Sequence, residues 1–590
     1  MYGTVANSLE HVGTHLLAAL TMAGFGDLFG LELVLLGGAW WLARKSKHFG
    51  EKFFEKIESS GSRWAQRKIA APLALAAVVI AVRVTVLPLL PMPQPVIVDE
   101  FSHLLLADTL AHGRLANPPH PNWRSFEAIH VIPQPTYSSM YFPGPALLLW
   151  AGQTLTGHPW AGILTGTAAL CALVCWALRG WFPARWALLG GILTALHIGL
   201  ASYWMDSYWG GTFAAMGSAL LFGAFQRLER TKRFGGQSAA LATLMALGIG
   251  MLANSRPYEG LMLCLPVAAR MAWWLGQGNL APKLLLSVLP LALCLAAIGA
   301  GMALYLQAVT GSATKLPYAV NQERYGWPLT LRWAEVKQME HDRPEFSSYY
   351  QYEKTERGYY ESVPQFLAGL ATKIQMDWRF FLGPALTIPC LFLPRIWRKP
   401  RLRFLLLGGA VVLLVVLTGP HFPHYMAPAL IPLMAVCVEG FRHLRQGELG
   451  LRLSRAIPVV LLATVGLRMA ATPLHPRLEA FGGYTSWCCS NRGSIDQPSV
   501  ERRLPAGRHL LLVRYRPDHQ WMNDWVHNGA DIDGARVVWA RELGGETDRS
   551  LLTHFRGRQT WLVEPDQSPV RITPYPPAQR LLSGREEQGR

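Results

Sequence analysis

Charged residues are scarce in this chain: they make up 16% of its 590 residues, whereas hydrophobic residues make up 51%. Soluble domains carry about a quarter charged residues, so the composition argues against an ordinary soluble enzyme. No basic stretch precedes the first apolar run, and we therefore expect no cleavable signal peptide. The net charge is +17, but Lys and Arg gather in short loops. This distribution favours a membrane-orientation signal and argues against nucleic-acid binding.

Cysteine is also infrequent, with eight residues in the chain. Six lie in or beside apolar segments and lack the spacing of a metal site, so we interpret them as packing residues. These six are Cys171, Cys175, Cys264, Cys294, Cys390 and Cys437. Cys488 and Cys489 are adjacent in a polar region. A vicinal disulfide, an intermolecular bridge and a purely structural role all remain open for this pair.

The chain contains instead a series of long apolar runs separated by short polar stretches. Each run is close to the ~20 residues that cross a hydrocarbon core as a helix, whose backbone groups must be paired within the segment. We predict about twelve transmembrane helices, of which the first is the least apolar because it contains Glu32. They cover residues 28–43, 71–90, 160–178, 186–204, 209–226, 238–253, 260–275, 284–309, 378–393, 404–418, 425–441 and 457–470.

The basic loops give this series an orientation. Cytoplasmic loops retain Lys and Arg, and threading the predicted helices places every short basic stretch on one side. These stretches are residues 44–68, 179–185, 227–233, 395–403 and 442–455. We therefore predict a multi-pass protein of the bacterial cytoplasmic membrane, with two long loops, 91–158 and 310–373, and the C-terminal tail outside the cytoplasm.

We expect the chain to divide into three parts. Residues 1–70 hold the first span and a basic segment whose spacing suits an amphipathic helix at the membrane interface. Residues 71–471 form an all-α polytopic domain. Residues 472–590 form a small α/β domain, with strands at 509–515, 536–540 and 559–563 and helices near 521–527 and 547–555. The apolar piece 145–155 is too short to span and is predicted to lie along the membrane surface. Loop 310–373 is either an ordered cap or a lid.

Ionisable groups at membrane edges are costly, so those that occur are candidates for function. Several lie where a predicted helix ends on the outer side. A site built from such helix ends can hold a headgroup while the lipid tail stays in the bilayer. The candidates are Asp99 and Glu100, Asp206 in a tight turn, Arg256 and Glu259 in a second turn, and His421 and His424 in a third.

Motifs around these residues resemble a known family. Residues 98–103 followed by 107–113 are similar to the first-loop signature of the GT-C glycosyltransferases, in the branch of the protein O-mannosyltransferases and the lipid A aminoarabinose transferases. In that branch an Asp-Glu pair ends the first conserved span. Residues 141–150 resemble its Pro-Pro or Pro-Gly element, and the Asp206 turn resembles its second acidic turn. Residues 255–257 and 422–432 resemble a basic position and a late Pro-containing span.

The resemblance implies transfer of a sugar from a polyprenyl-phosphate carrier to an acceptor outside the cytoplasm, which is a protein, a lipid or a glycan. Asp99 would be the general base for the acceptor. Glu100 would position the acceptor, orient Asp99 or help hold a divalent ion. Asp206 would orient the sugar or complete that ion site, so an ion, if bound, would use Asp99, Glu100 and Asp206. Arg256 would stabilise the leaving phosphate, since it is the one Lys or Arg in the short outer turns.

The sequence also departs from the family pattern. The aminoarabinose transferases carry Arg-Tyr where this chain has Ser102 and His103, and a Lys where it has Phe142. Another group must then bind phosphate by charge. The residues that we weigh for this are His103, His120, His130, Arg324 and Arg357. The complete set of predicted substrate-binding residues is Asp206, Arg256, Glu259, His103, Tyr141 and His424.

Structural roles compete with these assignments. Asp99 and Glu100 could form a solvated helix start, Asp206 could cap a helix, Arg256 could extend to lipid headgroups, and the two histidines could simply pack. Two other functions also remain. A secondary transporter would show paired halves and polar groups near mid-bilayer, and the sequence shows no such duplication. A non-catalytic scaffold with a binding tail would keep its function after Asp99→Asn.

Overall fold

The structure of the chain is a computed structural model, and it describes residues 29–46, 48, 50–326, 339–356, 363–419, 421–471 and 495–575. Cys488, Cys489 and Arg357 lie outside these residues. The chain divides into two compact units, each built from three separate stretches. The first takes its described residues from Met1–Pro93, Trp160–Ala300 and Tyr360–Asn491, and the second from Gln94–Pro159, Gly301–Tyr359 and Arg492–Arg590.

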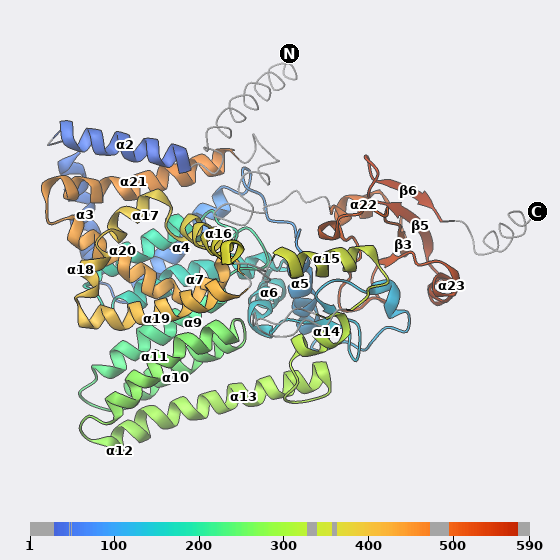
Figure 1. Cartoon of the computed structure of the whole chain (residues 1–590), viewed down its shortest axis with the longest axis horizontal. Helices are drawn as coiled ribbons and strands as arrows, with labels where there is room; N and C mark the ends of the chain where they lie inside the picture. The colour runs from blue at the N-terminus through green and yellow to red at the C-terminus, as the bar shows by residue number, and fades with distance from the viewer. Residues whose placement is uncertain are drawn as a thin grey trace, which may run out of the picture. The chain divides into compact units, whose positions relative to one another are not determined.

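The first unit is a bundle of helices (Figure 1). Its helices are α2 (Phe29–Lys45), α3 (Glu51–Ala65), α4 (Ala70–Thr85), α7 (Trp160–Leu178), α8 (Ala184–Thr194), α9 (Thr212–Glu229), α10 (Gly236–Ala253), α11 (Pro257–Leu275), α12 (Leu280–Lys283), α13 (Leu289–Thr310, which continues into the second unit), α16 (Val363–Phe381), α17 (Gly383–Cys390), α18 (Leu393–Trp397), α19 (Pro400–Thr418), α20 (Leu430–Leu444) and α21 (Glu448–Ala471). Two π-helical turns, Ala195–Gly199 and Leu284–Val288, and a 3-10 helix, η4 (Pro423–Ala429), complete the unit.

Six of the described helical segments are long and apolar enough to cross a membrane, or seven if the bent pair α3 and α4 counts as one span. The chain is therefore a multi-pass membrane protein, but the predicted number of about twelve spans is not confirmed. Several predicted spans are shorter or broken. The span expected at 378–393 ends as α16 at Phe381, and α17 begins at Gly383, whose φ of 54° belongs to the left-handed region that glycine tolerates.

The acidic residue in the first predicted span has a structural explanation. Glu32 is 1% exposed, and its Oε1 accepts a hydrogen bond from the backbone N–H of Ala385 at 2.7 Å. That N–H belongs to the first turn of α17, where helical N–H groups lack partners within their own helix. Glu32 therefore caps a neighbouring helix from inside α2. The amphipathic segment expected next is also helical, as α3, with Phe53 and Ile57 exposed.

The second unit combines the two long loops with the C-terminal tail. It contains α5 (Val98–Ala111), η1 (Trp123–Phe126), α6 (Pro143–Thr156), α14 (Pro317–Tyr325), α15 (Pro344–Glu356), α22 (Gln497–Arg503), η6 (Trp521–Asn523) and α23 (Gly545–His554). A short hairpin pairs β1 (Val131–Ile132) with β2 (Ser138–Ser139). A four-stranded sheet has the order β4-β3-β5-β6, from β3 (His509–Val513), β4 (Val537–Arg541), β5 (Gln559–Glu564) and β6 (Arg571–Pro574).

The three strands predicted for the tail are confirmed as β3, β4 and β5, and the helix predicted near 547–555 is confirmed as α23. β3 runs parallel to β4 and to β5, and β6 is antiparallel to β5. The prediction of a helix at 521–527 is wrong, because the structure has only the short 3-10 helix η6 there. The Asp524 side chain accepts hydrogen bonds from the Tyr515 hydroxyl at 2.5 Å and from the Val526 N–H at 3.1 Å. Such local side-chain bonds compete with a helix.

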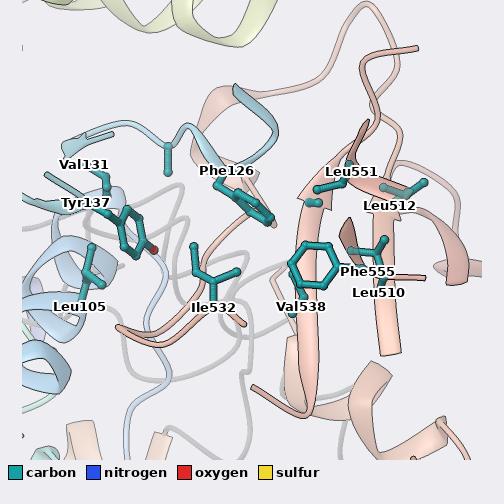
Figure 2. Packing of buried hydrophobic residues seen from close by; sticks show 12 residues of the cluster. Leu105, Phe126, Val131, Tyr137, Leu510, Leu512, Ile532, Val538, Leu551 and Phe555 are labelled. Carbon is teal, nitrogen blue, oxygen red and sulfur yellow. The ribbon is translucent and has the colours of Figure 1, made fainter. Parts of the chain in front are cut away.

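Loop and tail share one hydrophobic core, shown in Figure 2. Leu105 of α5, together with Phe126, packs in the same cluster as Leu510 of β3 and Val538 of β4. Each of these side chains is buried to 5% exposure or less. Burying one such side chain contributes on the order of 1.5–3 kcal/mol. The tail therefore does not fold as a free appendage, because α5, which carries Asp99, supplies part of its core.

Candidate functional site

Asp99 lies in the first turn of α5 and is held by two neighbours. Its Oδ1 accepts a hydrogen bond from the Tyr141 hydroxyl at 2.5 Å, and its Oδ2 lies 3.5 Å from Nδ1 of His130. The Asp99 side chain is 20% exposed, whereas that of His130 is 3% exposed. Tyr141 and His130 therefore orient the carboxylate, while part of it remains exposed.

The proton positions in this cluster follow from Tyr141. Burial, and then the neighbouring Asp99 carboxylate, raises the pKa of Tyr141 well above 10, so the hydroxyl stays protonated and gives its single proton to Asp99. The Tyr141 oxygen then accepts from Nδ1 of His130 at 2.9 Å. In the neutral ring this leaves Nε2 of His130 as an acceptor for the Tyr349 hydroxyl at 2.6 Å. Every donor in the chain Tyr349, His130, Tyr141 points toward Asp99.

The hairpin explains how these groups come together. His130 and Tyr141 lie just outside the two strands of the β1–β2 hairpin, in which Val131 pairs with Ser139. Ser102 of α5 donates to the carbonyl of His130 at 2.7 Å, which ties the hairpin to the helix that carries Asp99. The backbone φ of His130 is 65°, a left-handed value that is uncommon for a residue other than glycine.

Two more predicted residues lie in the same unit. The His103 ring stacks on the Tyr141 ring, with centroids 4.5 Å apart. Glu100 is fully buried, and its Oε2 accepts from the N–H groups of Val96 and Ile97 at 2.8 and 3.0 Å. This contact caps the start of α5. Of the predicted pair, Asp99 is the one with an exposed portion, and the catalytic role implied for Glu100 stays a prediction.

In the first unit, Asp206 forms a buried ion pair that the sequence did not reveal. Its Oδ1 accepts from Nη2 and Nε of Arg83, at 2.8 and 3.2 Å, and both side chains are at most 5% exposed. Arg83 also donates to the carbonyls of Leu90 and Pro91 and lies over the Trp160 ring. The pair joins α4 to the Asp206 turn. The sugar-orienting role implied for Asp206 stays a prediction.

Arg256 lies at the start of α11, with its guanidinium 4.0 Å from the centroid of the Tyr425 ring. Tyr425 belongs to η4, as does His424, whose Nδ1 lies 2.9 Å from the Tyr203 hydroxyl. Glu259 is 7% exposed in the first turn of α11. The structure therefore brings the predicted Arg256 and His424 turns to neighbouring elements. Their roles toward a substrate remain predictions.

Other buried polar groups of the first unit were not predicted as site residues. One of them, Asp377 of α16, lies 3.0 Å from His421, the candidate of the third turn for which packing was the competing role. Lys373 of the same helix donates to the carbonyls of Leu417 and Gly419 at 3.2 and 2.6 Å. In the sequence, each of these residues is an ionisable side chain within a largely apolar stretch, and the same is true of Arg83.

The residues considered as substitutes for a missing phosphate ligand have diverse environments. Arg324 donates to Oε1 of Gln134 at 3.0 Å and lies over the Trp123 ring. His130 belongs to the Asp99 cluster described above. His120 lies with Asp533 and His554 in a group whose ligand atoms are all within 4.8 Å of one another.

The His120 group could hold a metal ion by its residue types, but its hydrogen bonds favour another arrangement. Nδ1 of His120 accepts the Asn122 N–H at 3.0 Å, so the neutral ring carries its proton on Nε2. That proton faces Oδ1 of Asp533 at 3.4 Å, and Nε2 of His554 lies 2.8 Å from the same oxygen. An ion would have to displace the Nε2 proton. The ion site expected from Asp99, Glu100 and Asp206 stays a prediction.

No family model matches the chain, and no curated protein matches it. Among solved structures, it is similar to ArnT from Cupriavidus metallidurans bound to undecaprenyl phosphate, with 13% identity, a TM-score of 0.43, and 83% of this chain and 92% of that chain covered. It is also similar to the Archaeoglobus fulgidus oligosaccharyltransferase in complex with Zn and sulfate, with 13% identity, a TM-score of 0.44, and 84% and 67% covered. Both are GT-C glycosyltransferases. At these values the likeness assigns no role to any residue of this chain.

Proposed function

We propose that this chain is a membrane glycosyltransferase that moves a sugar from a polyprenyl-phosphate carrier to an acceptor outside the cytoplasm, with Asp99 as the general base. The observation that carries the proposal is the Asp99 cluster: a partly exposed carboxylate oriented by the Tyr141 hydroxyl and the His130 ring. A general base must be within hydrogen-bond reach of the proton that it removes, so it needs both exposure and a fixed orientation.

In this reaction Asp99 takes the proton from an acceptor hydroxyl or amine as that atom attacks the anomeric carbon of the sugar. The bond between that carbon and the carrier phosphate breaks, and the phosphate leaves with the electron pair. The Tyr141 and His130 donors hold the carboxylate in place. The sugar ring would lie beside the half-buried Tyr141 ring, against which the buried His103 ring is stacked.

The leaving phosphate gains negative charge, and a fixed cation stabilises it. Arg256 is our proposed cation, because the Tyr425 ring positions its guanidinium and the resemblance places a basic residue there. We expect Arg256→Met to lower the transfer rate by about 100-fold, the size expected for loss of one preorganised electrostatic contact. Arg256→Lys should retain part of the activity, since it keeps the charge without the planar fork. Initial rates of transfer from a lipid-linked sugar measure both.

Arg270 provides a matched control, because it also belongs to α11 and its guanidinium also lies 4.0 Å from the centroid of an aromatic ring, that of Trp273. Its side chain is 41% exposed. Arg270→Met should leave the rate within about twofold of wild type, as expected for an exposed charge. Equal losses in the two variants would remove Arg256 from the proposal.

The function itself is tested in cells with and without the gene. Extractable lipid-linked sugars and surface glycans are compared by mass spectrometry. Accumulation of one lipid-linked sugar together with loss of one glycan would support the proposal and identify both substrates. An unchanged pool of lipid-linked sugars together with unchanged glycans would contradict it.

A further inference from the structure

Helix α15, Pro344–Glu356, connects the sheet of the second unit to the Asp99 cluster. Glu345 and Tyr349 are four residues apart and therefore lie on the same face of the helix. Glu345 contacts Arg541 at the end of β4, and Tyr349 contacts His130. Neither contact is visible in the sequence, because each joins residues about 200 positions apart. One helix thus connects the end of β4 to the side chains that orient Asp99.

The contact at the sheet is a buried network of charges. The guanidinium of Arg541 lies 2.9 Å from Oε1 of Glu345 through Nε and 2.9 Å from Oδ1 of Asp524 through Nη2. Its Nη1 donates to the carbonyl of Glu127 at 2.8 Å. Arg541, Asp524 and Glu345 are at most 5% exposed. Burial alone would raise the pKa of Asp524, but Arg541, His527 and the hydrogen bonds from Tyr515 and Val526 together outweigh burial, and the net pKa is lowered. Asp524 therefore stays charged.

A second contact holds the same end of α15. Arg343, one residue before the helix, lies 2.8 Å from Oε2 of Glu127. The Tyr325 hydroxyl of α14 donates to Oε1 of Glu127 at 2.8 Å. The start of α15 is thus fixed both to the sheet and to the first outer loop. Tyr349, which lies four residues after Glu345 and is 2% exposed, donates a hydrogen bond from its hydroxyl to Nε2 of His130.

We propose that α15 is a positioning element of the active site, with Tyr349 and Glu345 as positioning residues. The inference rests on the proposed function of Asp99. By donating to Nε2 of His130, Tyr349 keeps the ring proton on Nδ1, where it faces Tyr141 and Asp99. The contact between Glu345 and Arg541 fixes α15 against the end of β4 and thereby positions Tyr349 toward His130. The C-terminal strands therefore act in catalysis through α15 without touching the substrate.

A double-mutant cycle on the full-length protein tests this coupling. Tyr349→Phe should lower kcat by about tenfold, the equivalent of roughly one lost hydrogen bond, with KM within about twofold of wild type. Glu345→Gln should lower kcat by a similar factor. The double variant should be no slower than the slower single variant, because both substitutions remove the same alignment. Multiplicative losses, or a rise of KM without a fall of kcat, would overturn the proposal.

Two substitutions in the same region serve as controls. Tyr352→Phe removes a hydroxyl from the same helix, where the Tyr352 ring lies against Trp521 rather than His130. Glu323→Gln removes an exposed carboxylate that pairs with Lys315 on the second outer loop. Both should keep kcat within about twofold of wild type, as surface or peripheral changes do. A tenfold loss in either control would show that the region responds to any change, which overturns the assignment to α15.

Hydrogen exchange provides a readout that does not depend on activity. In the full-length protein in detergent, Glu345→Gln should speed amide exchange in residues 128–141, whereas Glu323→Gln should not. Faster exchange in a protein that transfers no sugar would support the positioning role of α15 and reject the proposed function. Unchanged exchange in Glu345→Gln would overturn the positioning role, whatever the activity.

Discussion

Asp99→Asn is expected to abolish sugar transfer while the protein remains at normal abundance in the membrane. The amide has the shape of the carboxylate and still accepts a hydrogen bond from Tyr141 through its oxygen, but it cannot take up a proton. Loss of a general base costs about 10²–10⁴-fold in rate. Cells that carry only this variant should accumulate the same lipid-linked sugar as cells without the gene, which is measured in lipid extracts.

The control for this variant is Asp518→Asn, which removes a carboxylate that is 73% exposed in the same unit. It should leave the lipid-linked sugar at its wild-type level. If cells that carry Asp99→Asn retain both the wild-type glycan and the wild-type level of the lipid-linked sugar, Asp99 is not the general base. That result would favour a structural role for Asp99 at the helix start and a non-catalytic scaffold function for the protein.

Arg83→Met is expected to destabilise the first unit strongly. The substitution leaves the Asp206 carboxylate buried without its ion-pair partner, and breaking a buried pair in this way costs about 3–5 kcal/mol. Two backbone carbonyls, those of Leu90 and Pro91, also lose their donor. The midpoint of thermal unfolding of the purified protein in detergent should therefore fall well below that of wild type.

A second substitution distinguishes the unpaired charge from lost packing. Arg83→Met combined with Asp206→Leu removes both charges, and the double variant should regain much of the stability, because paired apolar replacements of buried ion pairs are often near neutral. Arg549→Met, which breaks a surface pair with Glu546, should cost at most about 1 kcal/mol. A double variant less stable than Arg83→Met would refute the ion-pair explanation.

The positions of the helices were largely predictable, because apolar length is a local property of the sequence. The predicted span 160–178 is α7, and the span 238–253 lies within α10. The breaks were not predictable in this way. A hydropathy window averages over residues such as Gly383, where a left-handed backbone ends one helix and starts another. Hydropathy therefore predicts where the helices lie better than it predicts how many of them cross the membrane.

The candidate site was predicted in part. Asp99, Tyr141 and His103 were singled out from motifs and lie together in the second unit. Tyr349 was not, since its contact with His130 joins residues 219 positions apart. Arg83 was missed for a related reason: a single arginine in an apolar run is outweighed by its neighbours in any average. Its partner Asp206, 123 positions away, is what stabilises it.

The tail shows a further limit of sequence reasoning. Its strands were predictable from β-branched and apolar runs, but its membership in a unit with the two long loops was not. The shared core between α5 and β3 depends on tertiary packing of apolar side chains, which carry no mark of their partner. Leu105 could as well have faced another helix.

The most direct test measures carrier release by the purified protein. Wild-type protein and Asp99→Asn are placed in liposomes with the lipid fraction from cells that lack the gene, and with membranes from the same cells as acceptor. The account predicts that wild type releases free polyprenyl phosphate while Asp99→Asn releases none above the protein-free background. Equal release by both proteins would contradict the role of Asp99 as the base.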